Sequence, residues 1–562
     1  MHFSRPSLGT GFFALSALLI SSTALAQTVP NQARPEFIER RSRIEDMRPE
    51  LGGAPLITLP EQEGKPIAGG VEFTLNGIRL QNATTFTEAD LKPLYEDKIG
   101  KPITVGGLNK IAADITAKYR NAGYILTRAV VPPQRAEGGI ITIRIVEGYV
   151  NEVRFTGDAS DNGVVQRYAK KIRASKPLDA KDLERYLLLM DDLPGIEARA
   201  VLQPSENTPG ASDVVVNVTR KKVDFSATID NRGSRFLGQY QAGLTAAVND
   251  VFRADDQTQV RILSSAFEPD ELFYGELRHE EQLGSEGLKL VLSANHAFTQ
   301  PGASVEQLDI EGHSQAYTVG LNYPIKRSRQ ANWFVSGDIT ARNVEVDTLD
   351  SNLYYDKTRV LALSTAYDFI DSMAAVNRLD AGVAQGFSFG TDSDSQANSR
   401  ANGETSFTKF NGRVSRIQPI MGSWSAYGVA AGQYSLDPLL ASEEFALGGS
   451  ELGSAYDPAE LTGDSGLAGR LELQYNQSPE ALISQYQLYG FYDIGRVWNE
   501  DPIAGSEASH ASLSSTGLGA RFNIADALSG GVEGSLPLTK DVGANGTDGA
   551  APRIFFNLLY RY

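Results

Sequence analysis

Cysteine is absent from this chain of 562 residues, and histidine, methionine and tryptophan are scarce. Without cysteine the protein has no disulfide bond, no thiolate nucleophile and no cysteine-ligated metal site. The five histidines are scattered and form neither an HExxH motif nor an i, i+4 pair. We therefore expect no metal site and no cofactor.

Positive charge is in deficit as well. The chain has 52 Lys and Arg residues against 69 Asp and Glu residues, a net charge of -17. Because binding a phosphate backbone needs concentrated Lys and Arg, this balance argues against nucleic acid as a partner. The sequence also lacks a G-x-S-x-G elbow, a P-loop and a dinucleotide fingerprint. We expect no catalytic residues and a protein that is not an enzyme.

Long hydrophobic runs are missing after residue 26. Residues 1–26 combine a weakly positive start, an apolar stretch and an Ala24-Leu25-Ala26 cleavage pattern, which is typical of a secretory signal peptide. The apolar stretch is shorter than the ~20 residues that a spanning helix needs. If the mature protein lies in a membrane, it must do so as a closed β-barrel.

Residues 27–70 are rich in charge and then in proline. The string PEFIERRSRIEDMRPE at 35–50 places its few apolar residues loosely on one helical face. It predicts either a solvated surface helix or a polar helix that plugs a water-filled lumen, and both remain open. Residues 52–70 contain Pro55, Pro60 and Pro66 without periodicity, which predicts a linker.

Two units with the same order of elements follow, at 71–149 and 150–221. In the first unit, alternation and helical spacing predict strands at 71–75, 123–126 and 140–146 and helices at 87–96 and 108–122. In the second unit they predict a strand at 152–156, helices at 162–172 and 179–193, and strands at 197–202 and 213–219. This β-α-α-β-β repetition indicates an internal duplication.

From residue 222 onward the helical pattern disappears. Residues 222–562 contain about sixteen alternating segments, with about 21 residues for each strand and its connection, a spacing that suits a membrane barrel. In RIFFNLLYRY at 553–562 every second side chain is apolar, and the chain finishes on an aromatic residue, as outer-membrane barrels typically do. The sequence thus predicts a transmembrane barrel of about 16 antiparallel strands, in the bacterial outer membrane, preceded by two α+β domains.

Three long strings carry a resemblance to a known family. GYILTRAVVPPQ at 123–134, IVEGYV at 145–150 and DLPGIEARAVLQPSENTPGASDVVVNV at 192–218 resemble the POTRA domains of two-partner secretion transporters, which export haemolysin-like and filamentous-haemagglutinin-like proteins. The resemblance covers essentially the whole mature chain. It implies periplasmic POTRA domains that capture an unfolded exoprotein through its N-terminal secretion domain. It also implies a monomeric barrel, surrounded by outer-membrane lipid, that passes the exoprotein outward.

The same resemblance implies a gate. In the family a long loop after strand 11 folds into the lumen, and an arginine at its tip pairs with the aspartate of a Phe-x-Asp-x-Gly strand. Here the loop spans about 435–467, and Phe491-Tyr492-Asp493-Ile494-Gly495 matches the strand motif. The gate residues implied are Gly448, Gly449, Gly453, Ser454, Ala455, Tyr456, Asp457, Asp493 and Gly495.

Ser454 stands where the family has its arginine. Asp493 then needs another cation, for which the candidates are Arg470, Arg496 and Arg521, or else the loop is held less firmly. On the second view, Ser454→Arg is expected to tighten the loop and to lower the resting conductance. The alternative functions are an outer-membrane insertase of the same architecture and, with less support, a passive porin or uptake receptor.

Overall fold

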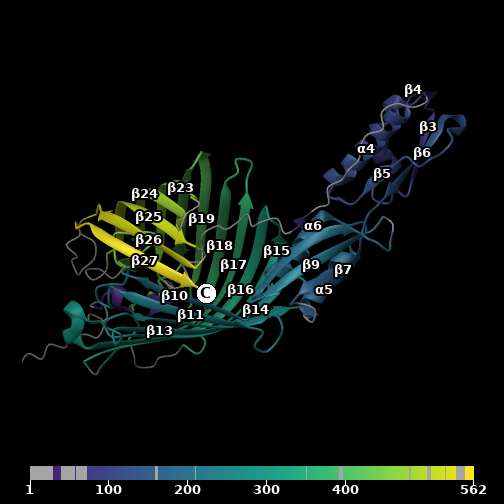
Figure 1. Cartoon of the computed structure of the whole chain (residues 1–562). Helices are drawn as coiled ribbons and strands as arrows, with labels where there is room; N and C mark the ends of the chain where they lie inside the picture. Colours follow the sequence, from purple (N-terminus) through teal and green to yellow (C-terminus); the bar gives the residue numbers. More distant parts are fainter. Residues whose placement is uncertain are drawn as a thin grey trace, which may run out of the picture.

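The protein consists of two small α/β units followed by a large β-barrel (Figure 1). The computed structural model describes residues 29–39, 57–58, 72–158, 163–208, 210–349, 351–391, 397–479, 483–502, 508–525, 527–539 and 551–562. The signal peptide predicted at 1–26 lies outside the described residues, as does most of 27–70. In the described ranges, no helix is long and apolar enough to cross a membrane.

The first α/β unit is built from short elements around one core. Their bounds are β2 Phe73–Thr74, β3 Gly77–Gln81, α3 Glu88–Leu91, β4 Pro102–Ile103, α4 Val105–Asn121, β5 Arg128–Val130 and β6 Ile140–Val146. β3 runs parallel to β6, and β5 is antiparallel to β6. Thr87 and Asp90 form a reciprocal capping box at α3, which confirms the helix start expected there. Leu108, Ile111 and Ile115 of α4 form the core with this sheet.

Two strands of this unit differ from the prediction. The main first strand is β3, whereas residues 73–74 only form a two-residue pair with β4. Residues 123–126, predicted as a strand, form turns. The reason is the joint with the second unit, where the carbonyl of Gly123 (φ +103°) accepts a hydrogen bond of 2.9 Å from the Ala180 N–H. The chain turns at 123–126 because the two units meet there.

The second α/β unit repeats the order of the first. Its elements are β7 Val150–Gly157, α5 Gly163–Ala174, α6 Ala180–Asp191, β8 Ile196–Pro204 and β9 Ser212–Arg220. Every bound lies within two residues of the expected one. A further strand, β1 at Ile57–Thr58, comes from the region predicted as a structureless linker and pairs in parallel with β8, so the sheet order is β1-β8-β9-β7. The linker therefore contains a short strand that its lack of periodicity did not reveal.

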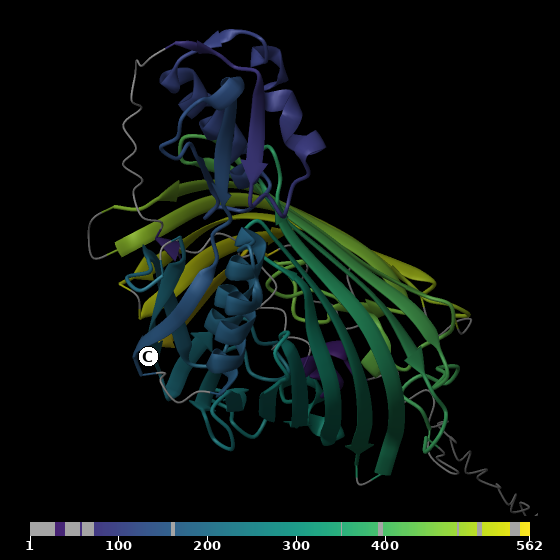
Figure 2. The same cartoon turned by 90° about the vertical axis from the view of Figure 1, so that its right-hand side faces the viewer.

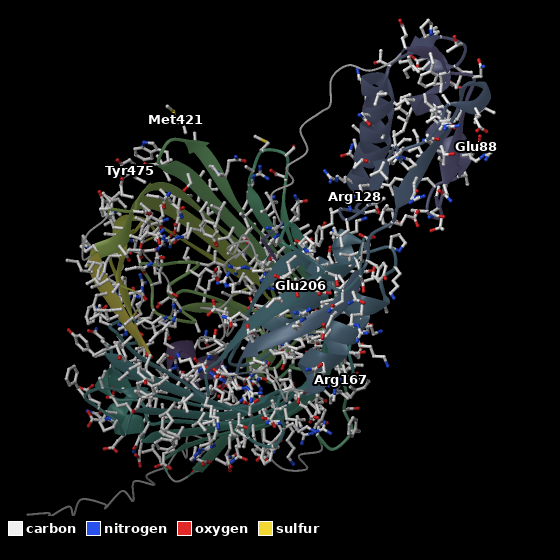
Figure 3. The ribbon with its side chains drawn as sticks, turned by 45° about the vertical axis from the view of Figure 1, so that its right-hand side comes forward. Glu88, Arg128, Arg167, Glu206, Met421 and Tyr475 are labelled. Atoms are coloured by element: carbon white, nitrogen blue, oxygen red, sulfur yellow. The ribbon has the colours of Figure 1, made fainter. Side chains whose placement is uncertain are left out.

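Charged side chains fasten the second unit to the turns of the barrel. Arg327 donates to both carboxylate oxygens of Asp192, at 2.7 and 2.8 Å. Lys171 of α5 pairs with Glu286 at 2.6 Å, and Arg185 of α6 donates to the main-chain carbonyl of Glu286 at 3.1 Å. In Figure 3, Arg167 and Glu206 mark this unit beside the barrel, whereas Glu88 and Arg128 mark the first unit farther out.

Sixteen strands close into the barrel, each antiparallel to its neighbours, so the predicted fold class is confirmed. Their bounds are β10 Val223–Asp230, β11 Gln241–Asn249, β12 Asp256–Ser265, β13 Leu272–Leu283, β14 Leu288–Thr299, β15 Ile310–Arg327, β16 Ala331–Thr348, β17 Ser351–Ile370, β18 Val376–Gly386, β19 Thr408–Met421, β20 Trp424–Ser435, β23 Ser465–Gln477, β24 Ile483–Trp498, β25 His510–Ile524, β26 Leu528–Pro537 and β27 Arg553–Arg561. Five residue pairs between β10 and β27 complete the circle.

Side chains alternate between the two faces of the wall. On β23, Leu471 and Leu473 are 68% and 52% exposed, whereas the alternate residues Arg470 and Glu472 are each 3% exposed. An apolar outer face and a polar inner face are what a barrel in lipid requires. Met421 and Tyr475, labelled in Figure 3, lie toward one rim of this wall.

The N-terminal residues 29–39 lie inside the barrel (Figure 2). They include the short helix η1 Asn31–Ala33 and a helical turn at 36–39. Val29, Ala33 and Ile38 pack in a buried cluster with wall residues such as Tyr274 and Val346. A segment of the chain that precedes both α/β units therefore occupies part of the lumen.

Candidate functional site

The long connection between β20 and β23 turns back into the barrel. It contains η6 Ala441–Glu443 and the small hairpin of β21 Phe445–Leu447 and β22 Leu461–Gly463. β20 is the eleventh strand of the barrel, so the connection is the one that the family resemblance implied. Ser454 is fully buried although it belongs to a connection and not to the wall. The segment at 448–457, called the loop tip below, meets the inner face of β24 and β25.

Three glycines shape the loop tip. Gly448, Gly449 and Gly453 have φ angles of +109°, +97° and +96°. Residues other than glycine rarely adopt this region of backbone conformation. The Gly449 N–H donates to the Tyr456 carbonyl at 3.2 Å, and the Tyr456 N–H donates to the Gly453 carbonyl at 2.9 Å. The tip is a compact turn whose path depends on these residues.

Main-chain groups of the tip dock onto Asp493 and its neighbour on the next strand. The Ser454 N–H donates to Oδ2 of Asp493 at 3.2 Å, and the Ala455 N–H donates to Oγ of Ser515 at 3.4 Å. The Ser515 hydroxyl donates to the other carboxylate oxygen of Asp493. One buried carboxylate thus receives the tip directly and through a serine.

The end of the tip makes two further contacts with the wall. The Tyr456 hydroxyl donates to the main-chain carbonyl of Ser514 at 3.0 Å, and the Asp457 carboxylate pairs with Arg553 of β27 at 2.7 Å. Ser514 and Arg553 lie on β25 and β27, which follow β24 around the barrel on the side away from β23. The tip therefore contacts the wall from β24 to β27.

Gly495, the last residue of the motif on β24, provides room for the loop. A Cβ at this position would lie 2.7 Å from Cδ1 of Leu447 and 3.0 Å from the Cβ of Ala468. Leu447, Ala455, Tyr456 and Ala468 form one buried cluster. Glycine at 495 lets the hairpin pack flat against the wall.

Arg470 is the cation that faces Asp493. The two residues are direct partners in the register of β23 and β24, and Nη1 of Arg470 lies 3.4 Å from Oδ2 of Asp493. The same guanidinium pairs with Glu472 at 2.8 Å and with Glu533 at 3.1 Å, and it lies over the ring of Phe491 at 3.8 Å from the centroid. Nη1 also donates to Oγ of Ser454. A cation of the wall thus faces Asp493, where the family resemblance implied a cation of the loop.

The other two candidate arginines lie elsewhere. Arg521 pairs with Glu472 at 2.9 Å and stacks over the ring of Tyr489. It is connected to Asp493 through Glu472 and Arg470. Arg496 is exposed on the outward face of β24, as are Tyr492 and Ile494. Arg496 is three residues from Asp493 and so has the opposite parity, a signal that was present in the sequence.

Arg470 supports the view that another cation serves Asp493, and it leads to a different prediction for Ser454→Arg. The prediction of a tighter loop assumed an empty cation position beside Asp493. Because Arg470 already contacts both Ser454 and Asp493, a second guanidinium at 454 would meet a like charge in a buried site.

Ion pairs that sequence reasoning did not identify hold the rest of the connection. Lys409 pairs with Glu443 at 2.7 Å, Arg413 pairs with Glu451, and Arg400 pairs with Asp464, all with the cation on or next to β19 and the acid on the connection. In each pair the cation and the acid lie far apart in the sequence, and no local motif marks the pair.

The N-terminal segment contacts both the wall and the connection. Glu39 pairs with Arg342 of β16 at 2.6 Å in a buried position, and the Tyr354 hydroxyl donates to Glu36 at 3.3 Å. The Asn31 amide donates to Oγ1 of Thr462 on β22 at 3.0 Å. The two segments that fill the lumen therefore also touch each other.

One acid on the connection is buried close to this junction. Burial raises the pKa of Glu444 to about 7, although a hydrogen bond with Thr462 and the charge of Arg400 act in the opposite direction. Burial likewise raises the pKa of Glu36 on the N-terminal segment, against the effect of Arg34. Both carboxyls hold protons more tightly while the lumen is filled than they would in water.

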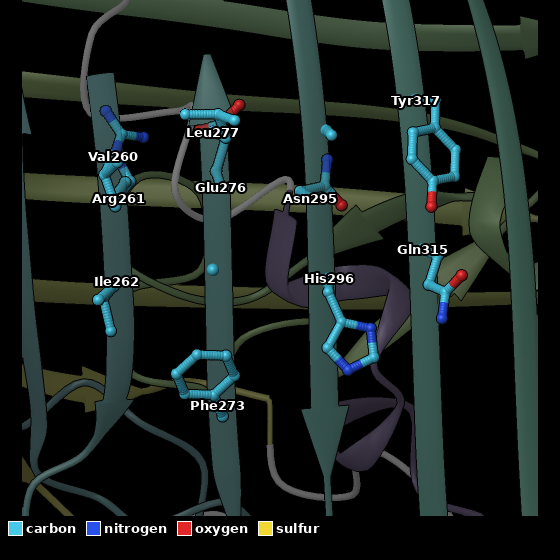
Figure 4. A pocket seen from close by; sticks show the side chains of 12 residues that line it. Val260, Arg261, Ile262, Phe273, Glu276, Leu277, Asn295, His296, Gln315 and Tyr317 are labelled. Carbon is cyan, nitrogen blue, oxygen red and sulfur yellow. The ribbon is translucent and has the colours of Figure 1, made fainter. Parts of the chain in front are cut away.

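A hollow of about 480 Å³ lies on the wall at β12–β15 (Figure 4). Its lining includes Ile262, Leu277, His296 and Tyr317, which belong to the outward parity of their strands. Figure 4 shows the N-terminal segment behind these strands, on the other side of the wall. Among the described residues, no group of three or more His, Asp or Glu side chains is arranged to hold a metal ion.

These features define an outer-membrane barrel whose lumen contains a loop and an N-terminal segment of the same chain. The chain belongs to the family described as Haemolysin secretion/activation protein ShlB/FhaC/HecB, which matches residues 210–522, and residues 73–148 match the ShlB-type POTRA domain. The prediction of a two-partner secretion transporter with a secreted exoprotein as its partner is thereby confirmed, as is the outer-membrane location.

Individual relatives are similar over most of their length. The Heme/hemopexin transporter protein HuxB of Haemophilus influenzae strain 86-028NP is 22% identical over 490 residues, which cover 84% of this chain and 85% of the relative. The Outer membrane transporter CdiB of Dickeya dadantii is 21% identical over 518 residues, 88% of each chain. The solved structure of CdiB from Escherichia coli has the same fold, with a TM-score of 0.72 at 19% identity over 97% of this chain and 100% of that one.

Gly495→Ala is expected to loosen the loop. The added Cβ would lie 2.7 Å from Leu447, so the hairpin must move away from the wall. We expect a higher resting conductance in planar bilayers. Gly490→Ala on the same strand is the matched control, because its Cβ would approach Leu518 of the outward face at 3.1 Å and the carbonyl oxygen of Gly517 at 3.9 Å, and neither belongs to the hairpin. Equal conductance in both variants would mean that the packing of Leu447 against the wall does not depend on glycine at position 495.

The resting conductance is expected to rise with pH. An acid whose pKa is raised in the docked state stabilises that state while it is protonated, and this contribution is lost as the pH rises from about 4.5 toward the pKa of about 7. The conductance at pH 8 should exceed that at pH 5.5, and Glu444→Gln should weaken the dependence. Glu404→Gln, on an exposed neighbouring connection, should leave it intact.

Proposed function

We propose that this protein captures an unfolded exoprotein with its two POTRA units and passes it through the barrel to the cell surface. The observation that carries the proposal is the filling of the lumen. The wall is a complete ladder of main-chain hydrogen bonds, and the two segments inside it are not part of that ladder. The contacts that hold these segments include side-chain ion pairs and the hydrogen bonds of the loop tip. Segments held in this way can leave without opening the wall, which frees a passage.

The loop tip acts as the gate in this proposal. Gly448, Gly449 and Gly453 give it its path, Ser454 and Ala455 present their N–H groups to the wall, and Asp493 receives them. Arg470 pairs with Asp493 and with the two neighbouring acids Glu472 and Glu533, and these contacts hold the three carboxylates in place. Release of the tip then breaks main-chain hydrogen bonds without separating the Arg470–Asp493 pair.

Residues 29–39 act as a plug in the same proposal. The buried pair of Glu39 and Arg342 supports this role, because an ion pair held away from water is specific in its geometry. The contact between Asn31 and Thr462 supports a shared resting state of plug and loop. We further propose that the POTRA units lie in the periplasm, that outer-membrane lipid surrounds the apolar outer face, and that one chain forms one pore.

An insertase for other barrels is the second candidate. BamA from Haemophilus ducreyi lacking POTRA domains 1-3 has a related fold, with a TM-score of 0.50 at 12% identity over 87% of this chain and 100% of that one. Export is favoured because the matching family is one of secretion proteins. No catalytic role is proposed. Because the periplasm holds no nucleotide, the proposal takes folding of the cargo outside the cell as the driving force of transport.

Exchanging the cation between wall and loop tests the gate. Arg470→Gln removes the cation that Asp493, Glu472 and Glu533 share, at a cost of about 3–5 kcal/mol, although Glu472 keeps Arg521 and Glu533 keeps Arg232. Ser454→Arg places two guanidinium groups together, so each single variant should raise the resting conductance. The double variant Ser454→Arg/Arg470→Gln restores one cation beside Asp493, as in the family. Its conductance should be lower than that of either single variant.

A matched control for this exchange is Arg253→Gln. Arg253 is 62% exposed in a turn of the barrel and pairs with Glu281, so its loss should leave the conductance unchanged. If the double variant simply combines the two single effects, positions 454 and 470 do not share one cation site.

Deletion of the gene separates export from insertion. We expect one large exoprotein to disappear from the culture medium and to return on complementation, while the set of outer-membrane barrel proteins stays the same. A depleted set of barrel proteins with unchanged medium would instead support the insertase.

A further inference from the structure

The outward face of the barrel carries a row of register partners that leads from the hollow on the wall to a cation. Direct partners in neighbouring antiparallel strands lie side by side on the same face of a sheet. On β13–β17 one such row consists of Gly275, His296, Gln315, Asn343 and Lys357. These positions have the outward parity of their strands. The row therefore connects an apolar hollow with a positive charge on the outer surface.

The hollow at the start of the row is shaped to accept an apolar chain. Gly275 contributes no side chain to it, and Ile262 and Leu277 flank this glycine on the outward face (Figure 4). A Cβ at position 275 would lie 3.4 Å from the nearest ring atom of Phe273, which is ordinary contact. The space above Gly275 is therefore bounded by hydrocarbon side chains on the face that the wall turns toward lipid.

Farther along the strands, the outward face changes from apolar to polar at one level. On β15, Tyr317 is 57% exposed, and the next outward residue toward the cell surface is Gln315. On β17, Leu361 is followed in the same direction by Arg359 and Lys357. Tyrosine is typical of the boundary between hydrocarbon and headgroups. The change indicates where the hydrocarbon ends on the outer side.

The lengths of the strands agree with this boundary. β17 ends at Ile370, on the side of the barrel to which the second α/β unit is fastened. Lys357 lies thirteen residues before that end, beyond the ~9–11 residues with which a strand crosses the membrane. Gly275 lies only eight residues before the corresponding end of β13 at Leu283. The hollow is therefore at the depth of acyl chains, and Lys357 is at the depth of the outer headgroups.

Two cations stand together at this outer level. Arg359 has the same parity as Lys357, and its Nη1 donates to the side-chain oxygen of Asn343 at 3.1 Å and to the main-chain carbonyl of Arg342 at 3.0 Å. Nζ of Lys357 lies 4.9 Å from the centre of the Tyr355 ring. Both charges are thus held along the outer surface. A guanidinium and an ammonium group close together suit a phosphate.

The acids of the same face lie farther toward the cell surface. Glu345 follows Asn343 as the next outward residue of β16, and its register partner is Tyr355. Glu311 is exposed on β15, beyond Gln315. Carboxylates accept hydrogen bonds from hydroxyl groups. Apolar, cationic and acidic groups therefore follow one another outward, an order that suits acyl chains, phosphates and sugars.

We propose that this part of the outer face binds one phosphorylated glycolipid of the outer leaflet, the lipid A part of lipopolysaccharide. An acyl chain occupies the hollow at Gly275, and a phosphate lies at Lys357 and Arg359. A phosphate free in solution would use the cations and leave the hollow empty. This inference goes beyond export of an exoprotein, and it rests on the proposed placement of the α/β units in the periplasm.

Binding of diphosphoryl lipid A to the delipidated full-length protein in detergent tests the inference, with native mass spectrometry as the measurement. Lys357→Gln/Arg359→Gln should weaken binding roughly thirtyfold, because each cation near an anionic membrane surface contributes about fivefold. Gly275→Leu fills the hollow and should weaken binding as well. Arg359→Lys keeps the positive charge and should retain most of the affinity.

Arg496→Gln and Gly412→Leu are the matched controls. Arg496 is an exposed, outward cation of β24, and its register partners Leu467 and Ser512 carry no charge. Gly412 is an exposed glycine of β19, where a Cβ would lie 3.8 Å from the carbonyl oxygen of Asp380. Both variants should bind diphosphoryl lipid A as tightly as the unchanged protein.

Equal affinity of the unchanged protein and of Lys357→Gln/Arg359→Gln would overturn the inference. Equally tight binding of phosphatidylglycerol, or full competition by inorganic phosphate, would overturn it too. Folding is checked by heat-resistant migration in detergent gels, and the two single variants replace the double variant if it fails this check. Because the assay uses no exoprotein, a negative result leaves the proposed export function intact, and a failure of export leaves the lipid result intact.

Discussion

Closure of the main-chain ladder is the constraint on which this structure depends. In hydrocarbon every backbone N–H and C=O needs a partner within the protein, and sixteen strands meet this need by pairing in a circle that ends with β10 against β27. A circle of that size is wider than its own side chains can fill. The polar inner face then faces an open space, and the chain closes it with the loop tip and with residues 29–39. In the proposed function, rest and transport differ in these two insertions and not in the wall.

The fold could be predicted from the sequence because it rests on local periodicity. Two-residue alternation gave the strands of the wall, as at Leu471 and Leu473, and the second α/β unit was located within two residues at every bound. Prediction failed at 123–126, where contact with the second unit overrides the pattern of the segment, and at β1, whose strand exists only because an edge is there to pair with it. Both errors involve partners that are distant in the sequence.

The site was predictable only in part, for the same reason. The motif around Asp493 and the glycines of the loop tip lie in short strings, and a parity count would have excluded Arg496. The choice of Arg470 depends on the register between β23 and β24, and its contacts with Glu472 and Glu533 depend on the curvature that brings β26 close. In this chain the cation that serves Asp493 belongs to the wall, so Asp493 keeps this cation when the loop tip leaves.

The fastening of the second α/β unit has a mechanical meaning. Arg327 and Lys171 tie this unit to the turns at β15 and at β13–β14, on one sector of the rim. A force on this unit is therefore transmitted to that sector of the barrel. In the proposed function, each exoprotein that the unit captures thus starts from the same sector of the rim.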